Sequence, residues 1–199
     1  MTFTTRFALA VLLSVLFVPG AVRTSGGNQV AIGDGVSLEP TISIVGGSPS
    51  EQAVVRQATE QFVSNDLALP DLAFRIHDDA TGCEGHRGLF RVADTTAVID
   101  LCFDCEFLAL HELGHAWVEF NLDDAERQEF QQATGATTWN SHDVPHDLRA
   151  NEIAANAIAY GLLSTPARPG TVWDRRCERF EALTGLAPPR PTGPVDTTR

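Results

Sequence analysis

The chain has 199 residues, of which 43% are hydrophobic, so it is long and apolar enough for one domain with a buried core. Its net charge is −12, and its 14 basic residues form no run of Lys or Arg. This composition argues against a nucleic acid as partner, because nucleic-acid-binding surfaces are basic.

The N-terminus has the layout of a secretory signal peptide. Arg6 precedes an apolar run from Phe7 to Val18, and small residues follow as far as Ala21. The run is shorter than the roughly 20 apolar residues that a membrane span needs. We therefore expect residues 1–21 to be a signal peptide, and the mature protein to be secreted or extracytoplasmic without a membrane span. An uncleaved membrane anchor is the alternative.

The next segments alternate between strand and helix patterns. Residues 22–48 are rich in Gly, Ser and Thr and are interpreted as a linker with one short strand, "TISIV". A helix is predicted from Ser50 to Asn65, because Ser50 can cap it and its apolar residues share one face. Alternating apolar residues predict strands at 72–77, 88–92 and 95–101.

The second half of the chain is predicted to be helical. The expected helices are 106–121, 122–133, 148–163 and 171–184, with a loop at 137–146. Residues 187–199 are Pro-rich and polar and are predicted to be disordered. This order of elements predicts an α+β fold over residues 49–186, in which a small twisted sheet packs on the helix at 106–121.

Four cysteines in an exported protein indicate two disulfides. They are Cys83, Cys102, Cys105 and Cys177, and their spacing leaves three pairings open. We expect Cys83–Cys102 and Cys105–Cys177. The alternative is a zinc knuckle at Cys102 and Cys105, although no second C-x2-C is present.

The helix at 106–121 carries the sequence "HELGH", an H-E-x-x-H motif. His111 and His115 are one turn apart, so both imidazoles can reach one Zn2+ ion. Glu112 points about 100° away from His111, where it can act as general base on a metal-activated water. The alternative is a pair of exposed helix histidines beside a solvated glutamate.

A catalytic zinc needs a third protein ligand. Glu119 lies two turns from His111 and is too far along the helix to share the ion. Glu152 begins the next long helix and could complete the site, with Asn156 one turn later orienting His111 by a hydrogen bond. Alternatively, Glu152 is only an acidic residue that suits a helix N-terminus.

The loop between these helices holds His142 and His146. Either imidazole could stabilise an oxyanion, and either could be an ordinary loop residue.

The pair of motifs, "HELGH" and then E-x-x-A-N-x-x-A-x-x-L-L from Glu152 to Leu163, resembles the ImmA/IrrE family of zinc metallopeptidases. The resemblance covers about residues 72–163. It implies a zincin-like fold, with His111, His115 and Glu152 as ligands and Glu112 as catalytic base. Ile158 departs from the family's usual Phe, and the export signal and cysteines are unlike its intracellular regulators.

The sequence therefore predicts a secreted zinc metallopeptidase whose partner is a peptide or protein substrate. A substrate strand is expected to pair with an edge of the sheet, with "TTAVIDL" at 95–101 as the expected edge strand. Two alternatives stay open. One is a non-catalytic zincin-like binding module, and the other is a zinc hydrolase that acts on a non-peptide amide.

Overall fold

The computed structural model describes residues 40–102, 105–163 and 171–189. The predicted signal peptide at 1–21, the linker residues 22–39 and the tail residues 190–199 lie outside the described residues. The strands are β1 Ile42–Gly46, β2 Asp71–Ile76, β3 Gly88–Ala93 and β4 Thr96–Leu101. The helices are α1 Pro49–Ser64, α2 Glu106–Asn121, α3 Asp124–Thr134, α4 Ala150–Leu162 and α5 Thr171–Thr184, with short 3-10 turns η1 Ala80–Cys83 and η2 His146–Leu148.

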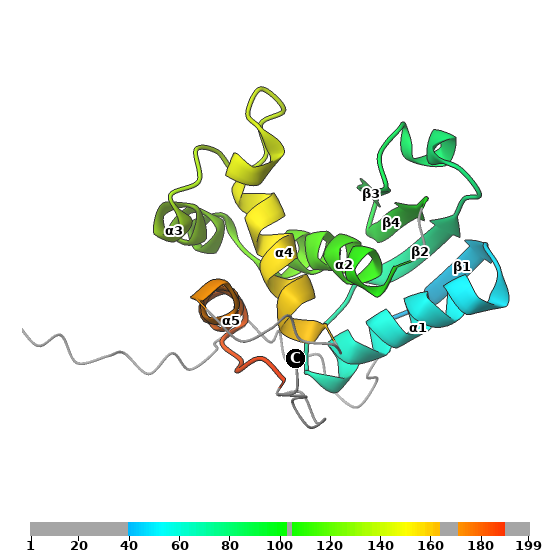
Figure 1. Ribbon diagram of the computed structural model, residues 1–199, viewed down its shortest axis with the longest axis horizontal. Helices are drawn as coiled ribbons and strands as arrows, with labels where there is room; N and C mark the ends of the chain where they lie inside the picture. The colour runs from blue at the N-terminus through cyan, green and yellow to red at the C-terminus, as the bar shows by residue number, and fades with distance from the viewer. Residues whose placement is uncertain (1–39, 103–104, 164–170, 190–199) are drawn as a thin grey trace, which may run out of the picture. The chain divides into compact units, whose positions relative to one another are not determined.

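The four strands form one mixed sheet in the order β1-β2-β4-β3 (Figure 1). Strands β1, β2 and β4 run parallel, and β3 is antiparallel to β4. The α+β fold and the small sheet are thus confirmed. Strand β1, which the sequence places in a linker, pairs along its whole length with β2 and is an edge of the sheet.

The predicted edge strand is wrong. Strand β4, within "TTAVIDL", lies between β2 and β3, so its backbone groups are paired on both sides. Its burial explains the position, because Val98 and Asp100 are buried on one face and Ala97, Ile99 and Leu101 on the other. The edge strand that contacts α2 is β3 instead.

Helix α1 begins one residue earlier than predicted. The hydroxyl of Ser48 accepts the backbone N–H of Glu51, and the Glu51 carboxylate accepts the N–H of Ser48. Pro49 occupies the first turn, where its missing N–H costs no hydrogen bond. Ser48 rather than Ser50 is therefore the cap.

The core lies between the sheet and the helices. Leu72 and Phe74 of β2, together with Ile99 of β4, are buried against Phe62 of α1 and Leu110 of α2. Helix α4 packs against α2, and α5 packs against α4 (Figure 1).

Helices α2 and α4 approach closely where both present small side chains. A Cβ on Gly114 would lie only 3.0 Å from the Cα of Ala155. This contact brings the first turns of α4 beside the middle of α2.

The disulfide between Cys83 and Cys102 is confirmed, with a Cα–Cα distance of 6.2 Å. It ties η1 to the end of β4. The predicted Cys105–Cys177 disulfide is wrong, because Cys105 is a thiol in this structure. Its Sγ accepts the backbone N–H of Leu108 at 3.4 Å and caps α2, while Cys177 lies on α5, which packs on α4.

Candidate metal centre

Helix α2 presents the two histidines of the motif side by side. His111 and His115 are one turn apart, and their rings meet edge to face with centroids 4.7 Å apart. Aromatic neighbours hold each ring, since Phe107 stacks on His111 and Phe90 of β3 stacks on His115. The Nε2 atoms of the two histidines are 3.2 Å apart.

Glu152, in the first turn of α4, joins His111 and His115 in a group of three side chains, which we call the metal group. Its Oε2 atom lies 3.3 Å from Nε2 of His111 and 3.3 Å from Nε2 of His115. The carboxylate is 7% exposed, so it is almost fully withdrawn from water. Helix packing thus brings together two imidazoles and one carboxylate from segments about 40 positions apart in the chain.

The triangle formed by these three atoms has the size of a metal site. Two ligands at about 2.0–2.1 Å from a tetrahedral Zn2+ ion are about 3.3–3.4 Å from each other. The observed separations of 3.2, 3.3 and 3.3 Å agree with that spacing. His111, His115 and Glu152 could therefore hold a metal ion.

The hydrogen bonding of these residues also fits a metal ligand set. Within the described residues, Oε2 of Glu152 is buried and has no hydrogen bond of good geometry, although three imidazole nitrogens surround it. A buried carboxylate oxygen left without a hydrogen bond is costly, and a cation offers it a partner. Nitrogen and oxygen donors in this combination suit zinc and related transition metals.

The charges within the group are coupled. Burial acts to raise the pKa of Glu152, but His111 and His115 together hold that pKa well below its usual range. Burial acts to lower the pKa of His115, yet the nearby Glu152 carboxylate produces a net rise. Glu152 is thus an anion that attracts a positive charge, either a proton or a metal ion.

Glu112 lies beside this group and takes no part in it. Its side chain is 5% exposed and packs against the backbone of Gly88 at the start of β3. A Cβ at position 88 would lie 2.4 Å from Oε1 of Glu112, so Gly88 leaves the space that the carboxylate occupies in this structure. Burial raises the pKa of Glu112, although the nearby histidines act against this. A carboxylate with a raised pKa is suited to accepting and returning a proton.

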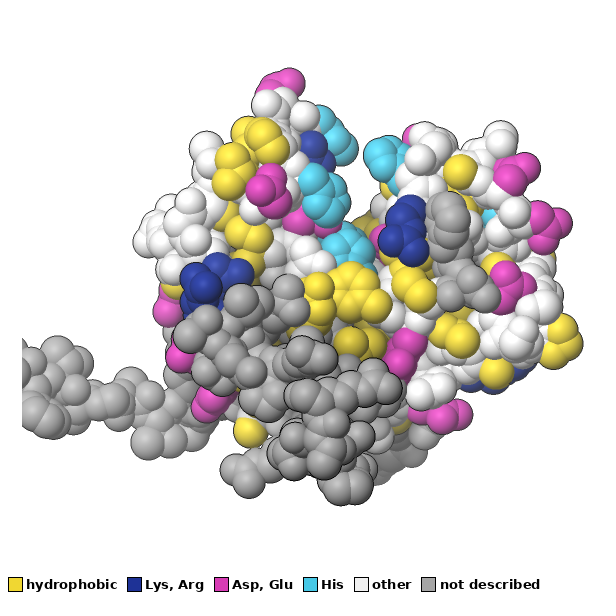
Figure 2. Space-filling view, viewed as in Figure 1, with side chains coloured by type: hydrophobic (Ala, Val, Ile, Leu, Met, Phe, Trp, Pro, Cys, Tyr) yellow, Lys and Arg dark blue, Asp and Glu magenta, His cyan; other side chains and the backbone are white. Residues whose placement is uncertain are grey.

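A cleft of about 640 Å3 opens onto these residues. Strand β3 and the preceding loop form one wall through His86, Gly88, Leu89 and Phe90, and the loop before α4 forms the other. Five of the six histidines of the chain line this cleft. Figure 2 shows histidine side chains on both sides of a hollow in the surface.

The two loop histidines differ in their relation to the metal group. His146, in η2, places Nε2 at 2.8 Å from Oε2 of Glu152, although its side chain is 63% exposed. Burial is the main cause that lowers the pKa of His146, so a neutral imidazole is favoured. His142 lines the outer part of the same cleft.

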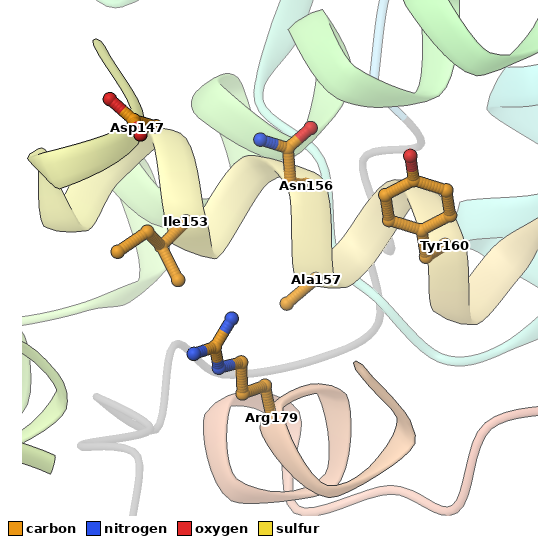
Figure 3. Close-up of a pocket in the computed structure, with 6 residues that line it drawn as sticks. All are labelled: Asp147, Ile153, Asn156, Ala157, Tyr160 and Arg179. Atoms are coloured by element: carbon orange, nitrogen blue, oxygen red, sulfur yellow. The ribbon is translucent and has the colours of Figure 1, made fainter. Parts of the chain in front are cut away.

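Asn156 does not reach the imidazole that it was predicted to orient. Nδ1 of His111 is buried and has no hydrogen-bond partner in the described part of the chain. Asn156 lines a separate pocket of about 250 Å3 between α4 and α5, with Tyr160 and Arg179. In Figure 3, Asn156 and Tyr160 project from α4 in the same direction, while Arg179 of α5 points toward α4 from the other side.

The structure also decides between the two candidate carboxylates. Oε2 of Glu119 lies 3.3 Å from Arg127 at the surface, and its side chain is 43% exposed. Among the residues that the structure describes, Glu152 is the carboxylate that groups with His111 and His115.

Sequence reasoning missed His86, Gly88 and Arg149, all of which line the cleft. None belongs to a motif. A glycine directly before an alternating apolar run was the one signal for Gly88, because glycine allows close approach of another chain segment.

The fold and the site together define an α+β protein with a candidate metal centre in a cleft between a sheet edge and two helices. Comparison with known proteins gave no match: no protein-family model, curated protein or solved structure is significantly similar to this chain. Among the described residues, no helix has the length and apolar character to cross a membrane.

Proposed function

We propose that this protein is a zinc-dependent metallopeptidase with a zincin-like fold. The observation that carries the proposal is the arrangement of Glu112 beside a three-ligand group at tetrahedral spacing, in an open cleft. A structural metal site has no need of a buried general base next to it. The "HELGH" and Glu152 motifs, and their resemblance to ImmA/IrrE metallopeptidases, support the same function.

The ligands in this proposal are His111, His115 and Glu152. A bound Zn2+ ion would polarise the scissile carbonyl and make water more acidic. Glu112 accepts a proton from the attacking water, and this proton passes to the amine nitrogen as the C–N bond breaks. His146 is close enough to Glu152 to face a substrate carbonyl over the metal group, where an N–H would stabilise an oxyanion.

Strand β3 is the proposed docking site for the substrate backbone. It is an edge strand, so one row of its N–H and C=O groups is not paired within the sheet. Its residues Gly88, Leu89 and Phe90 line the cleft next to Glu112. An extended peptide that adds to β3 would run past the metal group through backbone hydrogen bonds.

The Cys83–Cys102 disulfide supports a location outside the cytoplasm, because disulfides persist in oxidising compartments. We include secretion in the proposal on this ground and on the ground of the apolar N-terminal run.

The test is incubation of the zinc-loaded full chain with an unbiased peptide library. Wild-type protein should cleave peptides, and Glu112→Gln should lower turnover by about two to four orders of magnitude. The same variant should keep about one zinc per chain, because all three ligands remain. Full activity in Glu112→Gln would contradict the mechanism, and loss of zinc would place Glu112 among the ligands.

One observation favours a second candidate function. The 2.8 Å distance between His146 and Glu152 would allow a fourth protein ligand, which would close the site and make the metal structural. The protein would then be a binding module. In that case His146→Ala should lower zinc occupancy as strongly as His115→Ala, whereas in a peptidase it should lower turnover and leave zinc bound.

A further inference from the structure

The charge of the cleft differs from that of the whole protein. The chain carries a net charge of −12, yet within the described residues only two acidic side chains line the cleft. These two are Glu112 and Glu152, which face the proposed metal group. Apart from the proposed ligands His111 and His115, the other ionisable lining residues are His86, His142, His146 and Arg149, so the walls away from the metal group are neutral or positive.

Arg149 is the permanent positive charge in this wall. It is the residue directly before α4, three positions from Glu152, and its side chain is partly buried. It lines the same cleft as His111, His115 and Glu152. A substrate bound at the metal group would therefore lie within the field of Arg149.

The loop before α4 holds the guanidinium in place. Nε of Arg149 donates to the carbonyl of Val144 at 2.9 Å, and Nη2 donates to the carbonyl of His142 at 3.4 Å. These bonds use two of the five N–H groups of an arginine. The remaining three have no hydrogen-bond acceptor within the described residues.

Arg149 also lacks a carboxylate partner. No Asp or Glu of the described chain lies within ion-pair distance of it, whereas Arg91 pairs with two carboxylates and Arg127 pairs with one. An arginine that is oriented by backbone carbonyls and keeps free donors in a cleft is prepared for an anionic ligand.

We propose that Arg149 binds a carboxylate of the peptide substrate, so that the cleft selects acidic peptides over neutral ones. This specificity rests on the peptidase function proposed above. The carboxylate can come from an Asp or Glu side chain or from the C-terminus of the substrate, since both present the same pair of oxygens to the guanidinium.

The experiment measures binding apart from cleavage. Zinc-loaded Glu112→Gln protein is titrated with three versions of one peptide by fluorescence anisotropy. The first has Glu and an amidated C-terminus, the second has Gln and a free C-terminal carboxylate, and the third has Gln and an amidated C-terminus. The peptide is the best-cleaved one from the library. If none is cleaved, a pool of random peptides is prepared in the same three versions.

One of the two carboxylate peptides should bind about tenfold tighter than the neutral peptide, and the identity of that peptide shows the source of the carboxylate. The preference should fall as salt is raised. Adding Arg149→Gln should reduce the ratio to about one, and Arg149→Glu should favour a Lys-containing peptide. The matched control is Arg56→Gln on the exposed face of α1, which should leave the ratio unchanged.

The ratio is compared within each variant, so a loop loosened by the loss of Arg149 weakens all peptides and does not imitate the effect. Equal binding of the three peptides by the Arg149 protein, or an unchanged ratio in Arg149→Gln, would overturn the inference. Acidic peptides that bind through Arg149 and are never cleaved by the wild-type protein would support the carboxylate site and contradict the peptidase. Cleavage of peptides without any preference for a carboxylate would support the peptidase and contradict the carboxylate site.

Discussion

The residues of the proposed metal group can be tested one at a time, because each contributes a different atom to the site. Glu152 offers an oxygen that is equidistant from the two histidines, whereas Glu119 is paired with Arg127 at the surface. The two carboxylates therefore provide a matched pair of substitutions.

Glu152→Ala should abolish stable zinc binding, because two imidazoles rarely retain an ion against a chelator. Glu119→Ala should keep about one zinc per chain, since it removes only an exposed ion pair. Elemental analysis after dialysis against a chelator measures both. The opposite result would mean that the ion is bound elsewhere on α2.

Metal affinity should fall as the pH is lowered. A metal ion must displace the proton of His115, whose pKa is raised above the ordinary 6.5 by Glu152. At high pH the imidazole is neutral and binds metal. As the pH falls through the raised pKa, a proton competes, so the decline should begin above pH 6.5. Chelator competition between about pH 5.5 and pH 8 measures this, and a constant affinity over that range would be the contrary result.

The raised pKa of His115 has the opposite effect on the stability of the metal-free protein, which should increase as the pH is lowered. The protonated His115 and the Glu152 carboxylate form a stabilising pair, which is present below the unfolded pKa of about 6.5 and is lost as the pH rises through the raised folded value. Metal loading and protonation are therefore alternative ways to neutralise Glu152.

At the scale of the elements, the edge strand β3 sets the position of Glu112, the proposed general base. Gly88 is the first residue of that strand, and its missing side chain leaves the space that the Glu112 carboxylate occupies. In the proposed peptidase, the strand would contribute to catalysis through its backbone, in addition to its proposed role in docking the substrate.

Gly88→Ala should impair turnover while leaving metal and fold intact. The new Cβ would lie 2.4 Å from Oε1 of Glu112, and the flexible end of that side chain would move to relieve the clash. A displacement of about 1 Å at a catalytic group can cost on the order of a hundredfold in rate. Kinetics with zinc analysis and thermal melting measure the three properties.

Val92→Ala, at an exposed position of the same strand, is the control and should leave the rate unchanged. Unaltered turnover in Gly88→Ala would show that Glu112 does not need its present position.

At the scale of the whole molecule, the disulfide fixes the wall of the cleft that holds His86 and Gly88. It joins η1 to the end of β4 across 19 positions, and the enclosed chain leads directly into β3. The buried carboxylate of Asp100 reinforces this loop, because it binds His77 at 2.6 Å and also Arg91.

Replacement of Cys83 and Cys102 together by Ser should lower the free energy of unfolding by about 3 kcal/mol, the value expected for closing a loop of this length. Urea denaturation measures the change. In the wild-type protein, peptide mapping without reduction should find Cys83 linked to Cys102 and Cys105 alkylated. A bridge that includes Cys105 would contradict the structure.

The sequence by itself determined the parts of this protein that depend on neighbours along the chain. Helical spacing alone put His111 and His115 on one face with Glu112 beside them, and alternation located the strands within one or two residues. These features follow from the backbone geometry of a single element, so no knowledge of packing was needed.

Only the tertiary structure decided the features that depend on which elements meet. The close contact of Gly114 with Ala155 brings α4 onto α2 and so selects Glu152 over Glu119. The sheet order makes β3 rather than β4 the edge beside the site, and Cys105 caps α2 instead of forming a disulfide with Cys177. The cleft residues His86, Gly88 and Arg149 converge from separate loops, and no local pattern encodes such long-range contacts.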